Sequence, residues 1–244
     1  MTTLVFDDPT KMNIKLKKVI KPFSCQYCNT GFTKESTLTV HMCEQKRRAL
    51  AKSEKHVCLG YQTYVRFFQL TQNAKNTKSY EDFAKSQYYN AFVKFGSFLS
   101  NVDPLYLDRY IDYIVTSGIK LDHWCREEIY YKYVLELIKK EPADVAIERS
   151  ISTMIKWATA NNSQWNHYFK YVNANRSVYD IKDGKISPWV ILNSTTGREM
   201  VSKLSEEQLG IVYETLDPEF WAGRFKKYPS DLALIREVVK EGNL

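Results

Sequence analysis

Residues 23–41, FSCQYCNTGFTKESTLTVH, constrain the fold of this chain more than any other segment. Cys25 and Cys28 are separated by two residues, and His41 follows Cys28 after twelve more. Two thiolates at a hairpin turn and one imidazole from a following helix can bind a single zinc ion. A redox-active Cys-x2-Cys pair would instead require a surrounding βαβ pattern, which the flanking sequence lacks. The spacing therefore predicts a zinc site with Cys25, Cys28 and His41 as ligands.

The fourth ligand is less clearly specified. It is expected three to five residues after His41, but positions 45–47 hold Gln, Lys and Arg, which do not suit zinc. Cys43 is nearer, although two residues of a regular helix turn through about 200° and would point it away from His41. Cys43 can bind only if the helix tightens or breaks after His41. We favour Cys43 over His56, Cys58 or a water molecule, because closing a short loop costs less entropy.

Residues 21–43 resemble a two-Cys, two-His zinc finger. The resemblance rests on the metal-ligand spacing, on the Lys-Pro-Phe lead-in, and on Phe32 and Leu38 at the two apolar positions such a finger uses as its core. It implies a ββα fold and a bound Zn²⁺ ion. The base-reading positions of a DNA-binding finger fall here on Lys34, Thr37 and Val40.

Those positions predict weak sequence reading. Lys34 can reach a guanine edge and Thr37 can make a modest contact, whereas Val40 has no hydrogen-bonding group. A single finger also spans only about three base pairs. We therefore expect low sequence specificity from this unit.

Positive charge is concentrated near the N-terminus. Residues 1–55 contain eleven Lys or Arg and five Asp or Glu, a net charge of +6, so the remaining residues contribute only +1 of the chain's +7. Lys46, Arg47 and Arg48 follow the predicted finger and can hold phosphates without reading sequence. Concentrated positive charge beside a zinc module is typical of phosphate-backbone binders. We expect nucleic acid as the partner, DNA more than RNA; a solvated charged helix is the alternative.

The chain is predicted to be mainly α: an N-terminal arm (1–20), a ββα zinc finger with a basic helical linker (21–58), and an all-α domain (59–244). Apolar residues recur at helical spacing through the last of these, and only 9 Gly and 7 Pro occur in 244 residues. Ser79 with Asp82, and Ser205 with Gln208, have the spacing of capping boxes.

Three local features are expected to interrupt or limit these helices. Gly60 is expected to end the basic linker. Asp103-Pro104 is expected to supply an N-cap and first-turn proline to the next helix. Residues 186–192 (ISPWVIL) lack helical spacing and are expected to form a buried extended strap, with Pro188 excluding a central strand.

No catalytic residue is identified, because the sequence has no phosphate-binding Gly loop and no Gly-x-Ser-x-Gly elbow. No small-molecule substrate is evident either. The first hypothesis is a non-enzymatic zinc-finger protein that binds nucleic acid. The second is a protein-interaction adaptor or virion component whose finger binds protein, with another protein on the helical domain. A nuclease or other DNA-processing enzyme is third.

Five cysteines, an odd number, favour a reducing compartment, and no apolar run is long enough for a membrane span or signal peptide. We therefore expect an intracellular protein. The order of finger, VHMCEQKRR segment, aromatic helical domain and SPW segment is similar to uncharacterised proteins of large contractile-tailed bacteriophages. That resemblance implies a bacterial host cytoplasm.

Overall fold

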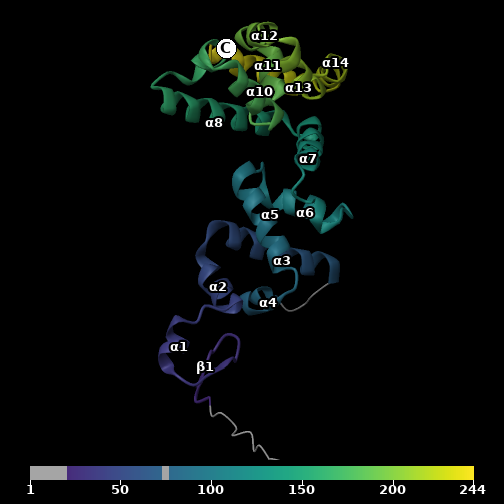
Figure 1. Cartoon of the computed structure of the whole chain (residues 1–244). Helices are drawn as coiled ribbons and strands as arrows, with labels where there is room; N and C mark the ends of the chain where they lie inside the picture. Colours follow the sequence, from purple (N-terminus) through teal and green to yellow (C-terminus); the bar gives the residue numbers. More distant parts are fainter. Residues whose placement is uncertain (1–20, 73–76) are drawn as a thin grey trace, which may run out of the picture. The chain divides into compact units, whose positions relative to one another are not determined.

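The computed structural model describes residues 21–72 and 77–244 and divides the chain into two units, Met1–Ser53 and Glu54–Leu244 (Figure 1). The arm expected at residues 1–20 lies outside the described residues. The described chain is mainly helical, with one small antiparallel sheet in the first unit. In this sheet Phe23 pairs with Phe32. The elements of the first unit are β1 (Phe23–Ser24), β2 (Gly31–Phe32), α1 (Glu35–Val40), α2 (Glu44–Leu50) and a 3₁₀ turn (Ala51–Ser53).

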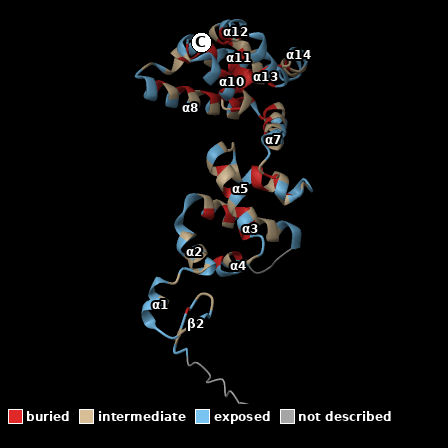
Figure 2. Ribbon diagram, viewed as in Figure 1, coloured by how far each residue is buried: buried red, intermediate tan, exposed pale blue. Residues whose placement is uncertain are grey.

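The first unit has almost no apolar core. Among its described residues only Cys25 is buried, with 3% of its surface exposed, and Figure 2 shows the unit mostly pale blue and tan. Phe32 and Leu38, the expected core residues, are half-buried. Phe32 packs its ring against His41, with the ring centroids 4.8 Å apart. A unit with so little buried apolar surface needs a cross-link or a metal ion to fold.

The second unit consists of helices of very different lengths. They are α3 (Lys55–Gln72), α4 (Tyr80–Lys85), α5 (Tyr89–Val102), α6 (Leu107–Thr116), α7 (Glu127–Lys140), α8 (Ala143–Asn161), α9 (Tyr168–Tyr171), α10 (Ala174–Lys182), α11 (Pro188–Asn193), α12 (Thr195–Ser202), α13 (Glu206–Leu216), α14 (Pro218–Lys227) and α15 (Pro229–Glu241), with 3₁₀ turns at Leu121–His123 and Trp165–His167.

Gly60 lies inside α3, so the expectation that it ends a helix is wrong. It lies where α3 crosses α5. A Cβ atom on Gly60 would be 2.7 Å from the Phe92 carbonyl oxygen, and one on Gly96 would be 2.0 Å from the His56 carbonyl oxygen. Glycine is required on both helices because their backbones approach too closely for any side chain. Around this crossing Phe92 and Phe95 are buried and contribute to an aromatic core.

Residues 186–192 are not an extended strap, because α11 begins at Pro188. The Ser187 hydroxyl accepts a hydrogen bond from the Trp189 N–H, and proline at the first helical position needs no hydrogen-bond partner for its nitrogen. Four successive residues of this helix, Pro188 to Ile191, are buried. A short helix buried on all sides has no polar face, which is why its sequence shows no helical periodicity.

A buried ion pair and the hydrogen bonds to it connect four helices of the second unit. Glu141, at the end of α7, accepts hydrogen bonds from Arg149 of α8, one of them at 2.6 Å from Nη2. Ser187, which caps α11, donates to the same carboxylate at 3.1 Å. The Glu141 carbonyl accepts from Arg224 Nη2 of α14 at 2.7 Å. The pair therefore has the additional hydrogen bonds that a buried charge requires.

Two of the predicted helix N-caps are present in the structure and one is not. Both predicted capping boxes are present, Ser79 with Asp82 before α4 and Ser205 with Gln208 before α13. Asp103 does not start a helix as expected. It ends α5 in a left-handed conformation (φ 48°), and the next helix begins at Leu107. Asp tolerates this conformation better than most residues, so the Asp-Pro pair serves as a helix stop here.

Candidate metal centre

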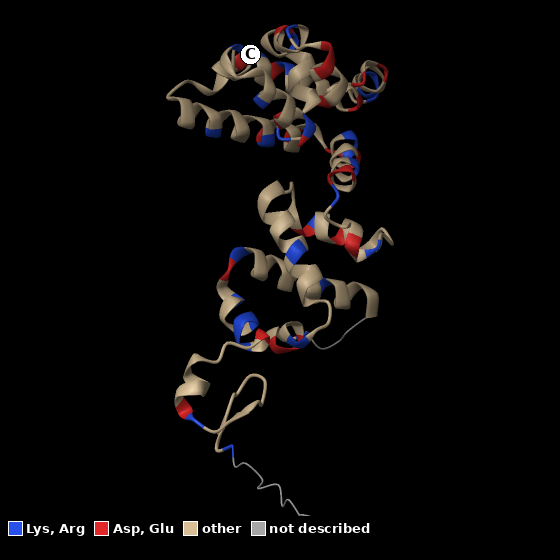
Figure 3. Ribbon diagram, viewed as in Figure 1, with Lys and Arg blue, Asp and Glu red and all other residues tan. Residues whose placement is uncertain are grey.

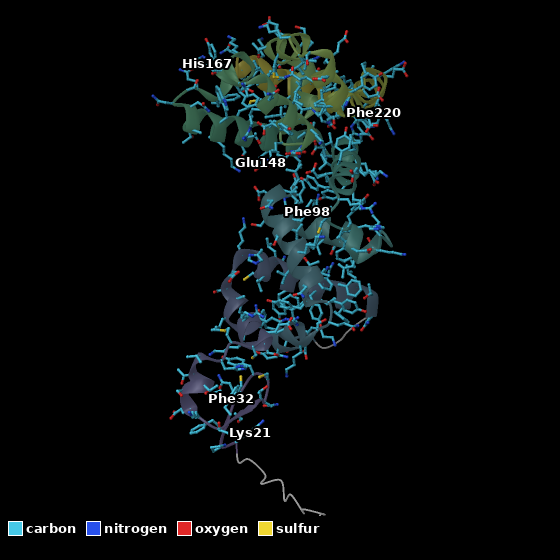
Figure 4. The ribbon with its side chains drawn as sticks, viewed as in Figure 1. Lys21, Phe32, Phe98, Glu148, His167 and Phe220 are labelled. Carbon is cyan, nitrogen blue, oxygen red and sulfur yellow. The ribbon has the colours of Figure 1, made fainter. Side chains whose placement is uncertain are left out.

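The structure brings together the side chains of Cys25, Cys28, His41 and Cys43. Their candidate ligand atoms all lie within 4.8 Å of one another. Cys25 Sγ is 3.9 Å from Cys43 Sγ, and Cys28 Sγ is 3.3 Å from His41 Nε2. Figure 4 labels Phe32, which covers the imidazole of His41, in the part of the first unit where the sulfur atoms (yellow) gather.

The two knuckle cysteines are positioned by a tight turn between β1 and β2. The Cys25 N–H donates to the Thr30 carbonyl at 3.0 Å, and the Asn29 N–H donates to the Cys25 carbonyl at 2.8 Å. Asn29 has a φ of 57°, which only Gly, Asn and Asp adopt at low cost. This turn directs both sulfur atoms to the same side of the hairpin.

Cys43 reaches the cluster because the helix breaks after Val40. His41 has an extended backbone (φ −67°, ψ 124°), and α2 starts again at Glu44 with Cys43 as its N-cap. The Lys46 N–H donates to Cys43 Sγ at 3.4 Å, and Lys46 Nζ donates to the His41 carbonyl at 3.2 Å. In a continuous helix, two residues turn through about 200°, so Cys43 would point away from His41. The break after Val40 removes this constraint.

Two of the separations between candidate ligand atoms are close to those of a tetrahedral zinc site. Zinc bound at about 2.3 Å to sulfur and about 2.0 Å to nitrogen places two sulfur atoms about 3.8 Å apart and a sulfur and a nitrogen about 3.5 Å apart. The observed separations of 3.9 Å and 3.3 Å lie close to these values. Three thiols and one imidazole are also ligand types that zinc prefers. The four residues could therefore hold a metal ion.

The pKa values of two cluster cysteines are shifted in opposite directions. The pKa of Cys28 is lowered to about 6, chiefly by the hydrogen bond with the Thr30 side chain, whose oxygen lies 3.1 Å away. Desolvation raises the pKa of Cys43, while the hydrogen bond from the Lys46 N–H acts in the opposite direction. A bound divalent cation would favour the thiolate form of each cysteine.

The predicted nucleic-acid contacts differ in how accessible they are. Lys34 and Thr37 are exposed on or beside α1, and Arg47 is exposed on α2. Lys46 is bonded to the His41 carbonyl, and Arg48 forms an ion pair with Glu44. Arg47 is therefore accessible on the surface, whereas the side chains of Lys46 and Arg48 form bonds within the first unit.

Sequence reasoning missed two residues that shape the cluster. Thr30 contacts Cys28, and Asn29 supplies the left-handed turn residue. A signal was available for the second: Asn directly after a Cys-x2-Cys pair is a residue type that favours a left-handed turn. The contact between Thr30 and Cys28 depends on the side-chain rotamer of Thr30, which the spacing of the cysteines does not predict.

No family model, curated protein or solved structure matches this chain. The similarity to bacteriophage proteins that the order of segments indicates is therefore not supported by these comparisons. Among residues 21–72 and 77–244, no helix is both long and apolar enough to cross a membrane. The fold and the site together define a mainly helical protein with a zinc-finger-like segment whose Cys₃His cluster could bind a metal.

Proposed function

We propose that residues 21–43 form a ββα finger that binds one zinc ion through Cys25, Cys28, His41 and Cys43, and that this finger and the basic segment after it bind nucleic acid, DNA more than RNA, with low sequence specificity. One observation carries the proposal. Cys43 is both a candidate ligand and the N-cap of α2. A metal ion at the cluster would therefore fix the start of the helix that presents the exposed Arg47.

The charges of the two short helices favour phosphate contacts over base reading. The sequence of α1, ESTLTV, carries one acidic residue and no basic residue (Figure 3). Its exposed Val40 cannot hydrogen-bond to a base edge. Arg47 lies in the last turn of α2, and Lys34 precedes α1. Isolated cations at these places suit the regularly spaced phosphates of a backbone more than a base-specific contact.

A salt series on the full chain tests this proposal. Affinity for a random-sequence DNA duplex should fall steeply between about 50 and 200 mM salt, and Arg47→Ala should reduce the slope of log K against log salt by about 0.9, the value for one phosphate contact. Lys156→Ala, which removes an exposed cation from α8 in the second unit, is the matched control and should leave the slope unchanged.

A second candidate function is protein binding by the finger. It is supported by three exposed apolar side chains in this small unit: Val40 is 79%, Met42 51% and Leu50 60% exposed. If these side chains form one apolar patch, that patch would suit a protein partner. This candidate replaces the first if the full chain binds no DNA at low salt, or if Arg47→Ala leaves the salt slope unchanged.

A further inference from the structure

A small pocket in the second unit is lined by residues at the end of α5, the start of α7 and the end of α10. Its volume is about 220 Å³, and its lining includes Val102 of α5, Tyr131 of α7 and Tyr179 of α10. Pockets that hold drug-sized ligands have volumes of about 300–1,000 Å³. This pocket therefore suits a smaller molecule, about the size of a single amino acid.

The turn that follows α10 brings charged side chains to the pocket. Asp183 and Lys185 line it, and Gly184 between them has a φ of 71°. A Cβ atom on Gly184 would be 2.9 Å from Val134 of α7, so only glycine lets the turn approach α7 this closely. The Lys185 carbonyl accepts a hydrogen bond from Thr153 Oγ1 of α8 at 3.1 Å. The backbone that carries Asp183 and Lys185 is therefore held in place by α7 and α8.

The charged groups of the pocket have both signs. Lys182 and Lys185 line it together with Asp183 and Glu127, so their formal charges cancel. Within the described part of the chain no residue donates a hydrogen bond to the Asp183 carboxylate, and its closest cation is Lys185 Nζ at 3.9 Å. The Asp183 side chain is 31% exposed, and burial raises its pKa, which the two lysines partly offset. Because carboxylates that are largely buried normally accept hydrogen bonds, Asp183 is available to a donor from a ligand.

A larger pocket between α3 and α6 differs in this respect. Its volume is about 580 Å³, but its polar side chains are bonded to one another. Gln62 Nε2 donates to Asp108 at 2.7 Å, and Arg66 Nη2 donates to Asp112 at 2.7 Å. A polar ligand would have to break these bonds, whereas at the smaller pocket the Asp183 carboxylate has no donor to lose.

We propose that the pocket between α5, α7 and α10 binds a free α-amino acid with an aromatic side chain. The ammonium and carboxylate groups of an amino acid are joined through one carbon atom, so they can reach the Asp183 and Lys185 charges, which are 3.9 Å apart. The aromatic side chain would pack against the rings of Tyr131 and Tyr179, the second of which is 58% exposed. A nucleotide fits less well, because it is larger and anionic while the charges of the pocket cancel.

This site goes beyond the proposed function and depends neither on zinc nor on nucleic acid. Its first test is titration of the full chain with L-phenylalanine, followed by saturation-transfer NMR and calorimetry. 3-Phenylpropionate, which lacks the ammonium group, and 2-phenylethylamine, which lacks the carboxylate, are the matched ligands. We expect each analogue to bind about tenfold or more weakly than L-phenylalanine, because each loses one charged hydrogen bond.

Two substitutions assign the charges to their partners. Asp183→Asn should weaken L-phenylalanine binding about tenfold without weakening that of 3-phenylpropionate, and Lys185→Met should do the same without weakening that of 2-phenylethylamine. Lys203→Met removes an exposed cation after α12 and should leave all three affinities unchanged. Urea midpoints establish that the variants are folded.

The inference is overturned if the wild-type chain does not bind L-phenylalanine at millimolar concentrations, or if either analogue binds as tightly. This comparison needs no variant and therefore holds even if a substitution prevents folding. Folded Asp183→Asn and Lys185→Met chains that bind L-phenylalanine as the wild type does would also overturn it. None of these results would bear on the zinc or nucleic-acid proposals.

Discussion

Cys25 Sγ and Cys43 Sγ lie 3.9 Å apart, although the two residues are 18 positions apart in the sequence. The contact joins the turn after β1 to the first residue before α2. It depends on the extended backbone of His41, which ends α1 and lets the chain turn back toward the hairpin. The helix break therefore adds a fourth candidate ligand to a motif that supplies three.

Removing the metal should unfold the finger and leave the helices of the second unit folded. Cys25 is the only buried residue among residues 21–53, so the metal would supply most of the folding free energy of this unit. We expect Cys25→Ser, His41→Ala or a strong chelator to abolish amide hydrogen-exchange protection in residues 21–50. The far-UV circular dichroism signal should remain mostly intact. A single cooperative collapse of the whole chain would contradict this division.

Asn29 should tolerate glycine but not alanine. Its φ of 57° costs an ordinary L-residue roughly 1 kcal/mol, whereas glycine adopts it without strain. Because folding and metal binding of the finger are coupled, Asn29→Ala should weaken zinc binding about fivefold in a chelator competition. Asn29→Gly is the matched variant and should stay within about twofold of wild type. Equal losses in both variants would show that the Asn29 side chain, not its backbone, is what the turn needs.

Gly96→Ala should strongly destabilise the second unit. The added Cβ would lie 2.0 Å from the His56 carbonyl oxygen, so α3 and α5 would have to separate, at a cost of about 1–3 kcal/mol or more. Gly210→Ala in α13 is the matched control, since its Cβ would meet no atom within 4 Å. That change should stabilise by about 0.5–1 kcal/mol through helix propensity. Urea unfolding followed at 222 nm compares the two, and equal stabilities would refute the close crossing.

The Asp82 carboxylate should stabilise the second unit at neutral pH and lose this effect at acidic pH. The Ser79 backbone N–H, followed by its hydroxyl, lowers the pKa of Asp82 below its ordinary value. A carboxyl group with a lowered folded-state pKa stabilises the fold above its unfolded pKa, near 3.9, and loses that contribution as the pH falls through the folded value. Asp82→Asn should therefore lower the urea midpoint at pH 7 and have little effect near pH 2.5. A pH-independent difference would show that the charge of Asp82 is not involved.

The sequence predicted the parts of this structure that depend on short-range patterns. The Cys-x2-Cys spacing and His41 identified three members of the cluster, and Ser-x-x-Asp and Ser-x-x-Gln identified two capping boxes that are present. The mainly helical character followed from apolar periodicity. Cys43 was predicted as a ligand only on the condition that the helix breaks, because the sequence alone does not show whether a helix continues past His41.

The errors arise where one residue type has two opposite uses. Glycine ends helices and also permits close helix crossings, and only the position of α5 decides that Gly60 does the second. Proline excludes a central strand and also begins helices, and Pro188 does the latter because Ser187 caps α11. The hydrogen bond from Lys46 Nζ to the His41 carbonyl could not be predicted either, because it depends on a backbone break that no local pattern specifies.

The most direct test of the account is the metal content and ligand set of the purified full chain. We expect one tightly bound zinc ion per chain by elemental analysis, and an absorption spectrum of the cobalt-substituted protein typical of tetrahedral coordination by three sulfurs and one nitrogen. Cys43→Ser should lower metal affinity on the order of 100-fold, whereas Cys58→Ser should not. A chain that retains no metal, with Cys25 and Cys28 as free thiols or joined to each other, would contradict the account.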